Sequence, residues 1–511
     1  MTSPENNAKI PWVRRVILAL VRLLCRAFFR RVEVVGLDNV PTDRGGVMVA
    51  WHPNGMVDPG LILATFPGDV VFGARHSAFR LPVLGWLMRA IGTVPIFRAG
   101  DTRQMSVEAR REANLTSLDA LAGRVAAGSF SCLFPEGESH DEPHPLDLKT
   151  GAARFYYRAR QLSKPGGEPP VIQPVGLHYD AKREFRSSVL VVFHPPMVIP
   201  AELDERPGED ESSETGRERC RALTEVIDTQ LDEVVLATES WETHRLLHRT
   251  RKLVRAERAC RAGANPGRAD MRERTLAFAR VWKGYYRRLM SHPKRVAALR
   301  SRVDEYDADL RALGIEDHEL DRSPKLASRF LAVALAAQVI GVYGLLPPLM
   351  VIGYMVNLPV AIGLWVLSKL VSQKRKDEAT IKMLFGAAAF PISWLAAGLL
   401  TAWSHHQLHM VFPSLPDAPL LAGLFVVGLG AVGGVVALRY QRLALETARA
   451  LRVRLTRARR RATLARLLEE RARLCDQVLS MAEGLDLPGR ITADGRADAD
   501  GWLDSGSTSG A

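Results

Sequence analysis

The sequence VMVAWHPNGMVDP, residues 47–59, decides the predicted fold. It begins with an apolar run that predicts a buried strand, and Pro53-Asn54-Gly55 is a turn signal. Asp58-Pro59 suits the beginning of a helix, because Asp caps helices and Pro fits the first helical position. A strand that turns directly into a helix indicates a crossover unit of an α/β fold.

Short apolar runs of the same kind recur through the first half of the chain. Stretches with helical periodicity separate them, which favours crossover connections and a largely parallel or mixed sheet flanked by helices. We therefore expect residues 32–235 to form one α/β domain. The predicted strands besides 47–51 are 32–35, 70–73, 93–97, 131–134, 171–177 and 189–193.

Residues 1–31 contain an amphipathic helical pattern in which arginines interrupt the apolar residues. No small-residue cleavage site follows, so the pattern does not predict a signal peptide. Such a helix can lie in a membrane interface, or it can cover one face of the neighbouring domain. Both interpretations fit the pattern, and we assign the segment as an interfacial helix.

A strongly apolar region lies in the second half of the chain. From Phe330 to Ser368 there is no charged residue, and as one helix this run would extend about 58 Å, nearly twice a hydrocarbon core of about 30 Å. We therefore expect two spans there, a third over 383–403 and a fourth over 418–438. Residues 326–440 would then form a transmembrane region of about four helices.

The flanking charges predict an orientation for these spans. The loop 374–378 is basic and arginines are frequent after Leu438, whereas the loop between the third and fourth spans has no Lys or Arg. The positive-inside rule then places residues 1–329, the 374–378 loop and the C-terminal tail in the cytoplasm. Together with the Arg- and Ala-rich composition and the lack of a targeting peptide, this favours a bacterial inner membrane.

The remaining segments are polar. Residues 236–325 are expected to be helical and basic, 441–488 to form an Arg-rich cytoplasmic helix, and 489–511 to be a disordered tail. The net charge of +13 suits anionic membrane lipids as partners. No zinc-finger, zipper or RNA-binding signature favours nucleic acid, and the five scattered cysteines predict no metal site.

His52 and Asp58 are the candidate catalytic pair. Six positions apart, they cannot share one face of a continuous helix, but the turn between them could bring the two side chains together. An imidazole that a carboxylate orients is a general base for an alcohol. No Ser or Cys nucleophile is needed if an acceptor hydroxyl attacks the acyl donor directly.

Three further blocks follow in order: a strand that ends at Arg98, the sequence FPEG at 134–137, and an apolar strand that contains Pro174. With the His52 block, they resemble the glycerol-phosphate and lysophosphatidate acyltransferase family over about residues 31–235. The resemblance implies transfer of a fatty acyl group from acyl-CoA or acyl carrier protein to a glycerol-backbone hydroxyl, without a further cofactor.

The resemblance also implies roles for individual residues. His52 would be the base and Asp58 its orienting partner, and Arg98 would bind the acceptor phosphate. Glu136 and Gly137 would shape the acceptor site, and the strand of Pro174 would close it.

This chain departs from the usual family pattern at three places. Trp51 precedes His52, where the family often has Asn. The spacing is His-x5-Asp rather than His-x4-Asp, and Ser139 stands where the family often has a phosphate-binding Arg. Both features resemble the fungal glycerol-3-phosphate/dihydroxyacetone-phosphate branch. We expect Lys149 to supply the missing charge and glycerol 3-phosphate to be the acceptor, in phospholipid biosynthesis.

Two alternatives remain open at this point. Ser139 also fits an enzyme that acylates 1-acylglycerol 3-phosphate or another lysophospholipid. The Arg-rich tail and the N-terminal helix fit an inactive scaffold that shapes membranes.

Overall fold

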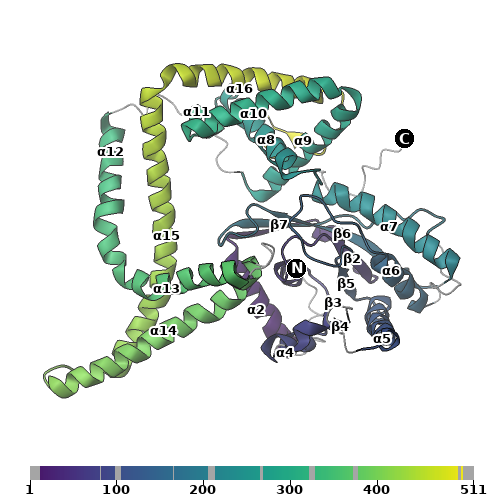
Figure 1. The fold of residues 1–511 in the computed structure, drawn as a ribbon, viewed down its shortest axis with the longest axis horizontal. Coiled ribbons are helices and arrows are strands. Elements are labelled where there is room, and N and C mark those ends of the chain that lie inside the picture. Colours follow the sequence, from purple (N-terminus) through teal and green to yellow (C-terminus); the bar gives the residue numbers. More distant parts are fainter. Residues whose placement is uncertain are drawn as a thin grey trace.

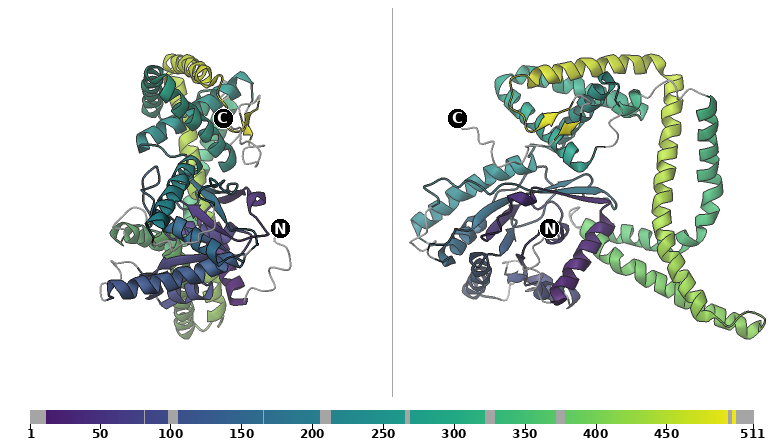
Figure 2. Two further views of the ribbon diagram at one scale, coloured as in Figure 1. Left: turned by 90° about the vertical axis from the view of Figure 1, so that its right-hand side faces the viewer. Right: turned by 180° about the vertical axis from the view of Figure 1, so that it is seen from behind.

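A computed structural model describes residues 12–80, 82–97, 105–164, 166–204, 213–264, 269–321, 329–371, 378–492 and 496–498 (Figure 1). It shows an α/β domain, a group of helices above it in Figure 1, and long helices that extend to one side. The same three parts can be followed from two other directions in Figure 2.

A seven-stranded sheet forms the centre of the α/β domain, in the order β1-β7-β6-β2-β5-β3-β4. Neighbouring strands are parallel except for the antiparallel pair β6 and β7. All seven predicted strands are present, which confirms the predicted mixed, mostly parallel sheet. The strands are β1 (Arg31–Val35), β2 (Gly46–Ala50), β3 (Val70–Arg75), β4 (Val94–Ile96), β5 (Phe130–Leu133), β6 (Val171–Tyr179) and β7 (Ser188–Phe193).

Helices cover both faces of this sheet because successive side chains of a strand point to opposite faces. On β2, Met48 and Ala50 pack into the core under α2 (Trp12–Phe28) and α3 (Val57–Thr65). Val47 and Val49 pack on the other side, in the core shared with α5 (Val107–Ala126), α6 (Gly151–Leu162) and α7 (Glu214–Val235). The short elements η1 (Leu37–Asn39), η2 (His76–Arg80) and α4 (Pro82–Ala90) complete the domain.

Helix α2 carries apolar side chains on two sides, of which one is buried and the other is exposed. Ile17, Cys25 and Phe28 are buried, so one side of α2 covers the sheet, as one interpretation of the sequence predicted. A second apolar stripe is exposed and recurs at helical spacing. That stripe, which could lie in a membrane interface, consists of Trp12, Val16, Leu20 and Leu23.

The polar segments on either side of the apolar region form one helical unit. Its helices are α8 (Trp241–Arg261), α9 (Met271–Ser291), α10 (Pro293–Leu313), α11 (Asp317–Leu320) and α16 (Arg461–Ala482). Their shared core includes Leu253, Val303 and Leu474. The fully buried Arg471 of α16 pairs with Glu257 at 2.9 Å and with Asp321 at 2.5 Å. Segments that the sequence analysis treated separately are therefore held together.

The chain end differs from the prediction of a disordered tail over 489–511. Two short strands, β8 (Arg490–Ile491) and β9 (Ala497–Asp498), pair antiparallel there. They are held because Ile491 and Ala497 pack with Leu276 of α9. The rest of the predicted tail lies outside the described residues.

The apolar region contains α12 (Arg329–Ile340), the π-helical turn η4 (Gly341–Leu345), α13 (Leu346–Val371), α14 (Glu378–Val411) and α15 (Pro419–Arg459). Among the described residues, α13, α14 and α15 are long and apolar enough to cross a membrane. A shorter apolar segment, Val333–Leu345, lies where the first of four spans was predicted. The number of spans stays a prediction, and most of the 374–378 loop lies outside the described residues.

Close packing joins α13, α14 and α15. A β carbon on Gly353 would lie 3.1 Å from Cα of Gly433, so these helices approach backbone to backbone. The amide of Asn357 donates to the carbonyls of Gly353 and Gly430, at 2.9 Å each, and accepts from Nε1 of Trp394 at 2.9 Å. Small residues and an interhelical polar clamp are typical of helices that associate in lipid.

Candidate active site

The candidate site begins where β2 ends. The chain leaves the strand after Ala50 and turns at Gly55, which has a φ of 47°, before α3 begins at Val57. This turn brings Nδ1 of His52 to 2.9 Å from Oδ2 of Asp58. Asp58 lies inside the first turn of α3 and not at the capping position that the sequence predicted, and the loop that precedes the helix folds back onto its carboxylate.

The Asp58 carboxylate is completely buried and fully engaged. Its Oδ2 accepts from the backbone N–H of Asn54 at 2.8 Å and contacts His52, and its Oδ1 accepts from the hydroxyl of Tyr179. Burial, and then the neighbouring Asp58, raise the pKa of Tyr179 well above its usual value, so Tyr179 stays a donor at neutral pH. A buried carboxylate needs such donors to remain charged.

This hydrogen bonding fixes the orientation of the His52 ring. The Asp58 carboxylate accepts a hydrogen bond from Nδ1–H, and Nε2 then carries the free lone pair. The ring also stacks on Phe134, with 4.1 Å between centroids and 16° between planes. The His52 side chain remains 18% exposed, so the imidazole is held on one side and accessible on the other.

Glu136 lies behind His52. It is buried, and its Oε2 accepts from the backbone N–H of His52 at 2.8 Å. Its Oε1 lies 2.7 Å from Nε2 of His140 and accepts from the N–H of Leu146 at 3.3 Å. Glu136 therefore links the loop after β2 to the loop after β5, and both of its carboxylate oxygens already have hydrogen-bond partners.

Gly137 and Lys149 lie together next to Glu136. Gly137 has a φ of 76°, which favours glycine, and a β carbon there would lie 2.6 Å from Nζ of Lys149. Lys149 is exposed, and Ser139, two residues beyond Gly137, is half-buried. The structure thus brings the ammonium of Lys149 to the FPEG turn, where the sequence analysis sought a replacement cation.

The outcome differs for Arg98 and Pro174. Arg98 lies outside the described residues, although the side chain of Asn114 holds both backbone groups of the preceding Phe97, at 2.8 Å each. Pro174 is buried inside the sheet, opposite Val49. It therefore lies beside β2, the strand that leads to His52.

Sequence reasoning missed the residues that hold the catalytic loop from a distance. The N–H of Met56 donates to Oγ1 of Thr380 at 3.2 Å, and Ala379 and Met383 join the core beneath α3. The first turn of α14, an apolar helix, therefore packs on the loop between His52 and Asp58. No local sequence pattern connects positions so far apart in the chain.

A second missed residue is Lys182, just after β6. Its carbonyl accepts from the side chain of Asn54 at 2.9 Å, and its ammonium lies 2.5 Å from Asp141. Burial lowers the pKa of Lys182 to about 8, while Asp58 and Glu142 act in the opposite direction.

Among the described residues, no group of three or more His, Cys, Asp or Glu side chains is placed to hold a metal ion.

Comparison with known proteins identifies two parts of the chain. Residues 31–178, which contain the His52–Asp58 pair, match the acyltransferase family model. The second match is more particular: residues 273–486 match the glycerol-3-phosphate acyltransferase 2 C-terminal domain. The predicted resemblance to glycerolipid acyltransferases is therefore confirmed.

Individual relatives agree with these matches. An uncharacterised acyltransferase of Schizosaccharomyces pombe is 24% identical over 302 residues, covering 56% of this chain and 42% of that protein. Glycerol-3-phosphate O-acyltransferase 1 of Saccharomyces cerevisiae is 29% identical over 193 residues, covering 37% and 23%. Glycerol-3-phosphate O-acyltransferase 2 of the same yeast is 25% identical over 191 residues, again covering 37% and 23%. The chain thus spans less than half the length of these relatives.

Proposed function

We propose that this protein is a membrane-bound O-acyltransferase that moves a fatty acyl group from acyl-CoA or acyl carrier protein to a hydroxyl of glycerol 3-phosphate. The observation that carries the proposal is the 2.9 Å contact between Nδ1 of His52 and the buried carboxylate of Asp58. It lies in a domain of the acyltransferase family, and two relatives are named glycerol-3-phosphate O-acyltransferases.

In the proposed mechanism His52 acts as a general base. Asp58 keeps the proton on Nδ1, so Nε2 takes the proton of the acceptor hydroxyl as its oxygen attacks the thioester carbonyl. The carbon–sulfur bond then breaks, and the imidazolium returns the proton to the departing thiolate. Asp58 stabilises the imidazolium in between, because its carboxylate stays charged within its hydrogen bonds.

Two cations, Lys149 and Arg98, would bind the acceptor phosphate. Lys149 is exposed beside Gly137, and Arg98 follows the backbone that Asn114 fixes. An ammonium and a guanidinium are both suitable phosphate ligands, and Arg can bind with two parallel hydrogen bonds. Glu136, Gly137, Ser139 and Pro174 would shape and support this part of the site.

The exposed apolar surfaces favour work at a membrane. Three long apolar helices are described, and the exposed stripe of α2 lies on the same domain as His52. Because the first turn of α14 packs on the catalytic loop, the site would lie close to the membrane surface. We propose that it faces the cytoplasm; the bacterial inner membrane stays a prediction from sequence alone.

A lysophospholipid is the second candidate acceptor, because Ser139 replaces the Arg of the family pattern. An acceptor panel separates the two. Purified protein in lipid nanodiscs receives acyl-CoA, or acyl carrier protein loaded with an acyl chain. In parallel reactions it receives glycerol 3-phosphate, dihydroxyacetone phosphate, 1-acylglycerol 3-phosphate or a neutral lysolipid, and products are read by mass spectrometry. We expect product from glycerol 3-phosphate. Product from lysolipids alone would support the second candidate, and no product from any acceptor would contradict both.

A further inference from the structure

A pocket lies in the helical unit, away from the candidate active site. It is lined by α8, α9, α10 and α16 and by the segment that leads into β8, its volume is about 150 Å³, and it opens to solvent. None of its lining residues belongs to the His52 site. Ligand pockets commonly have volumes of about 300–1,000 Å³, so this space encloses only part of a small amphiphile.

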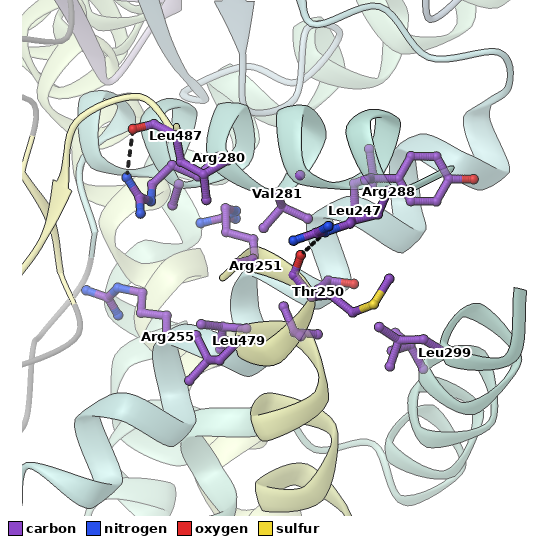
Figure 3. Close-up of a pocket in the computed structure, with 18 of the residues that line it drawn as sticks. Leu247, Thr250, Arg251, Arg255, Arg280, Val281, Arg288, Leu299, Leu479 and Leu487 are labelled. Carbon is purple, nitrogen blue, oxygen red and sulfur yellow. Dashed lines mark hydrogen bonds between the residues drawn. The ribbon is translucent and has the colours of Figure 1, made fainter. Parts of the chain in front are cut away.

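Apolar side chains form most of the pocket wall. They come from all four helices, and they leave a continuous surface that is suited to a hydrocarbon chain. Figure 3 shows Val281, Leu299 and Leu479 around the space between the helices. The other apolar residues that matter here are Leu246, Leu247, Val254, Val296, Val303 and Val478.

Arginines supply nearly all the charge of the pocket. Six of them line it, and Glu273 is the single carboxylate among the lining residues. In Figure 3, Arg280, Arg251 and Arg255 lie one below another on the left of the view, whereas Leu299 lies on the right. Arg288 is labelled on the right of the same view, so arginines and apolar side chains both surround the space. The remaining arginines are Arg258, Arg288 and Arg300.

Arg251 is the most informative of these residues. It is only 4% exposed, and its Nε has no hydrogen-bond partner among the described residues. Glu273 and Asp180 favour its charge through space, but each already pairs with another arginine: Glu273 with Arg255 at 2.8 Å, and Asp180 with Arg274. Burial lowers the pKa of Arg251 to about 10. A buried guanidinium without its own carboxylate is unfavourable for folding, and an anion would offset that penalty.

We propose that this pocket binds a single-chain anionic amphiphile, such as a fatty acid or a lysophosphatidate. The acyl chain lies between α9, α10 and α16, and the anionic head lies against Arg251. Neutral single-chain lipids would leave the buried guanidinium without a counter-charge, and a purely polar anion would leave the apolar part of the wall uncovered. The site is separate from the proposed acyl transfer and does not depend on it.

Photo-crosslinking tests this proposal on the full-length protein. The protein is placed in phosphatidylcholine nanodiscs and exposed to a palmitic acid that carries a diazirine in its chain, and cross-linked peptides are mapped by mass spectrometry. Competition with unlabelled palmitate, palmitoyl lysophosphatidate, monopalmitoylglycerol and inorganic phosphate separates the possible ligands. We expect cross-links on α9, α10 or α16 that palmitate or lysophosphatidate removes, with the stronger competitor identifying the head group. Competition by the neutral lipid as strong as by palmitate, or cross-links only on α12 to α15, would contradict the proposal.

Three variants make the test specific. Arg251→Met removes the buried charge, Val281→Trp fills the apolar space, and Arg287→Met removes an exposed arginine of α9 that does not line the pocket. We expect Arg251→Met to weaken palmitate binding at least about tenfold, since hydrogen bonds to charged groups contribute that much. Val281→Trp should abolish the cross-links, and Arg287→Met should change nothing.

Thermal unfolding without added lipid distinguishes a role of Arg251 in ligand binding from a role in folding alone. If Arg251 binds a ligand, Arg251→Met keeps or raises the Tm while losing the stabilisation that palmitate gives to the unmodified protein. If Arg251 is needed only for folding, its loss lowers the Tm. In that case wild-type binding by Val281→Trp, provided it folds, would overturn the proposal.

Discussion

The hydroxyl of Thr380, in the first turn of α14, accepts a hydrogen bond from the backbone N–H of Met56 at 3.2 Å. Met56 lies in the turn that brings His52 to Asp58, and Thr380 begins a helix that is long and apolar enough to cross a membrane. The geometry of the catalytic loop is therefore linked directly to the apolar region. Lys382, two residues further along α14, strengthens the link by donating to the carbonyl of Arg183 at 3.2 Å.

Replacing Thr380 with Val tests whether this link positions the catalytic loop. We expect kcat to fall about two- to tenfold with little change in KM, since one neutral hydrogen bond contributes about 0.5–1.5 kcal/mol. Thr380→Ser keeps the hydroxyl and should restore kcat. Equal loss in both variants, measured in the acyl transfer assay, would assign the effect to packing instead.

Replacing Tyr179 with Phe removes one of the donors to Asp58. The buried Oδ1 then has no partner from this side chain, and an unsatisfied buried acceptor costs about 1–3 kcal/mol. We expect a lower Tm and a lower transfer rate, because Asp58 is both destabilised and less firmly oriented. Tyr285→Phe, on α9 of the helical unit, is a matched control whose transfer rate should stay unchanged. An unaltered rate in Tyr179→Phe would argue against a role for Tyr179 in orienting Asp58.

The burial of His178 in β6 predicts that the folded protein loses stability in acid. Burial lowers its pKa to about 3, below the usual value of 6.5, so the unfolded chain binds a proton between these pH values while the folded protein does not. Stability therefore falls as the pH drops from about 6.5 towards 3. In His178→Gln the loss of stability between pH 7 and pH 5 should shrink by roughly 1 kcal/mol, a figure reduced for the partial exposure of the side chain. Identical Tm-against-pH curves for the two proteins would rule this contribution out.

Replacing Asn357 with Leu tests the clamp between α13, α14 and α15. It removes hydrogen bonds to Gly353 and Gly430 and leaves Nε1 of Trp394 without its acceptor. We expect a loss of about 1–2 kcal/mol, in the range of interhelical hydrogen bonds in membranes. Unfolding in increasing concentrations of a denaturing detergent measures this loss of stability. The control is Leu358→Ala, at a more exposed neighbouring position, which should have a smaller effect.

Sequence could predict the sheet and the proximity of His52 and Asp58 because both depend on local order. Each strand is a short apolar run, and burial on both faces leaves few other assignments for such runs. His52 and Asp58 are joined by one tight turn, so their proximity follows from Pro53-Asn54-Gly55. The cap was misassigned because the Asp58 carboxylate turns back to Asn54 instead of serving the end of the helix.

Long-range contacts could not be predicted in the same way. Tyr179 and Thr380 reach the loop only through tertiary packing, and neither position has a local pattern that distinguishes it. The helical unit is a second example. Arg471 and Glu257 form an ion pair although the apolar region separates them in the sequence. Arg-rich helical patterns alone do not indicate which partner each arginine has.

The most direct test of the central proposal compares acyl transfer to glycerol 3-phosphate by the unmodified protein, His52→Ala and Asp58→Asn, with the Tm of each measured alongside. Loss of the general base should lower kcat at least about 100-fold. We expect that loss in His52→Ala and a substantial loss in Asp58→Asn, with His52→Ala still folded. Transfer by a folded His52→Ala protein at the rate of the unmodified protein would contradict the account.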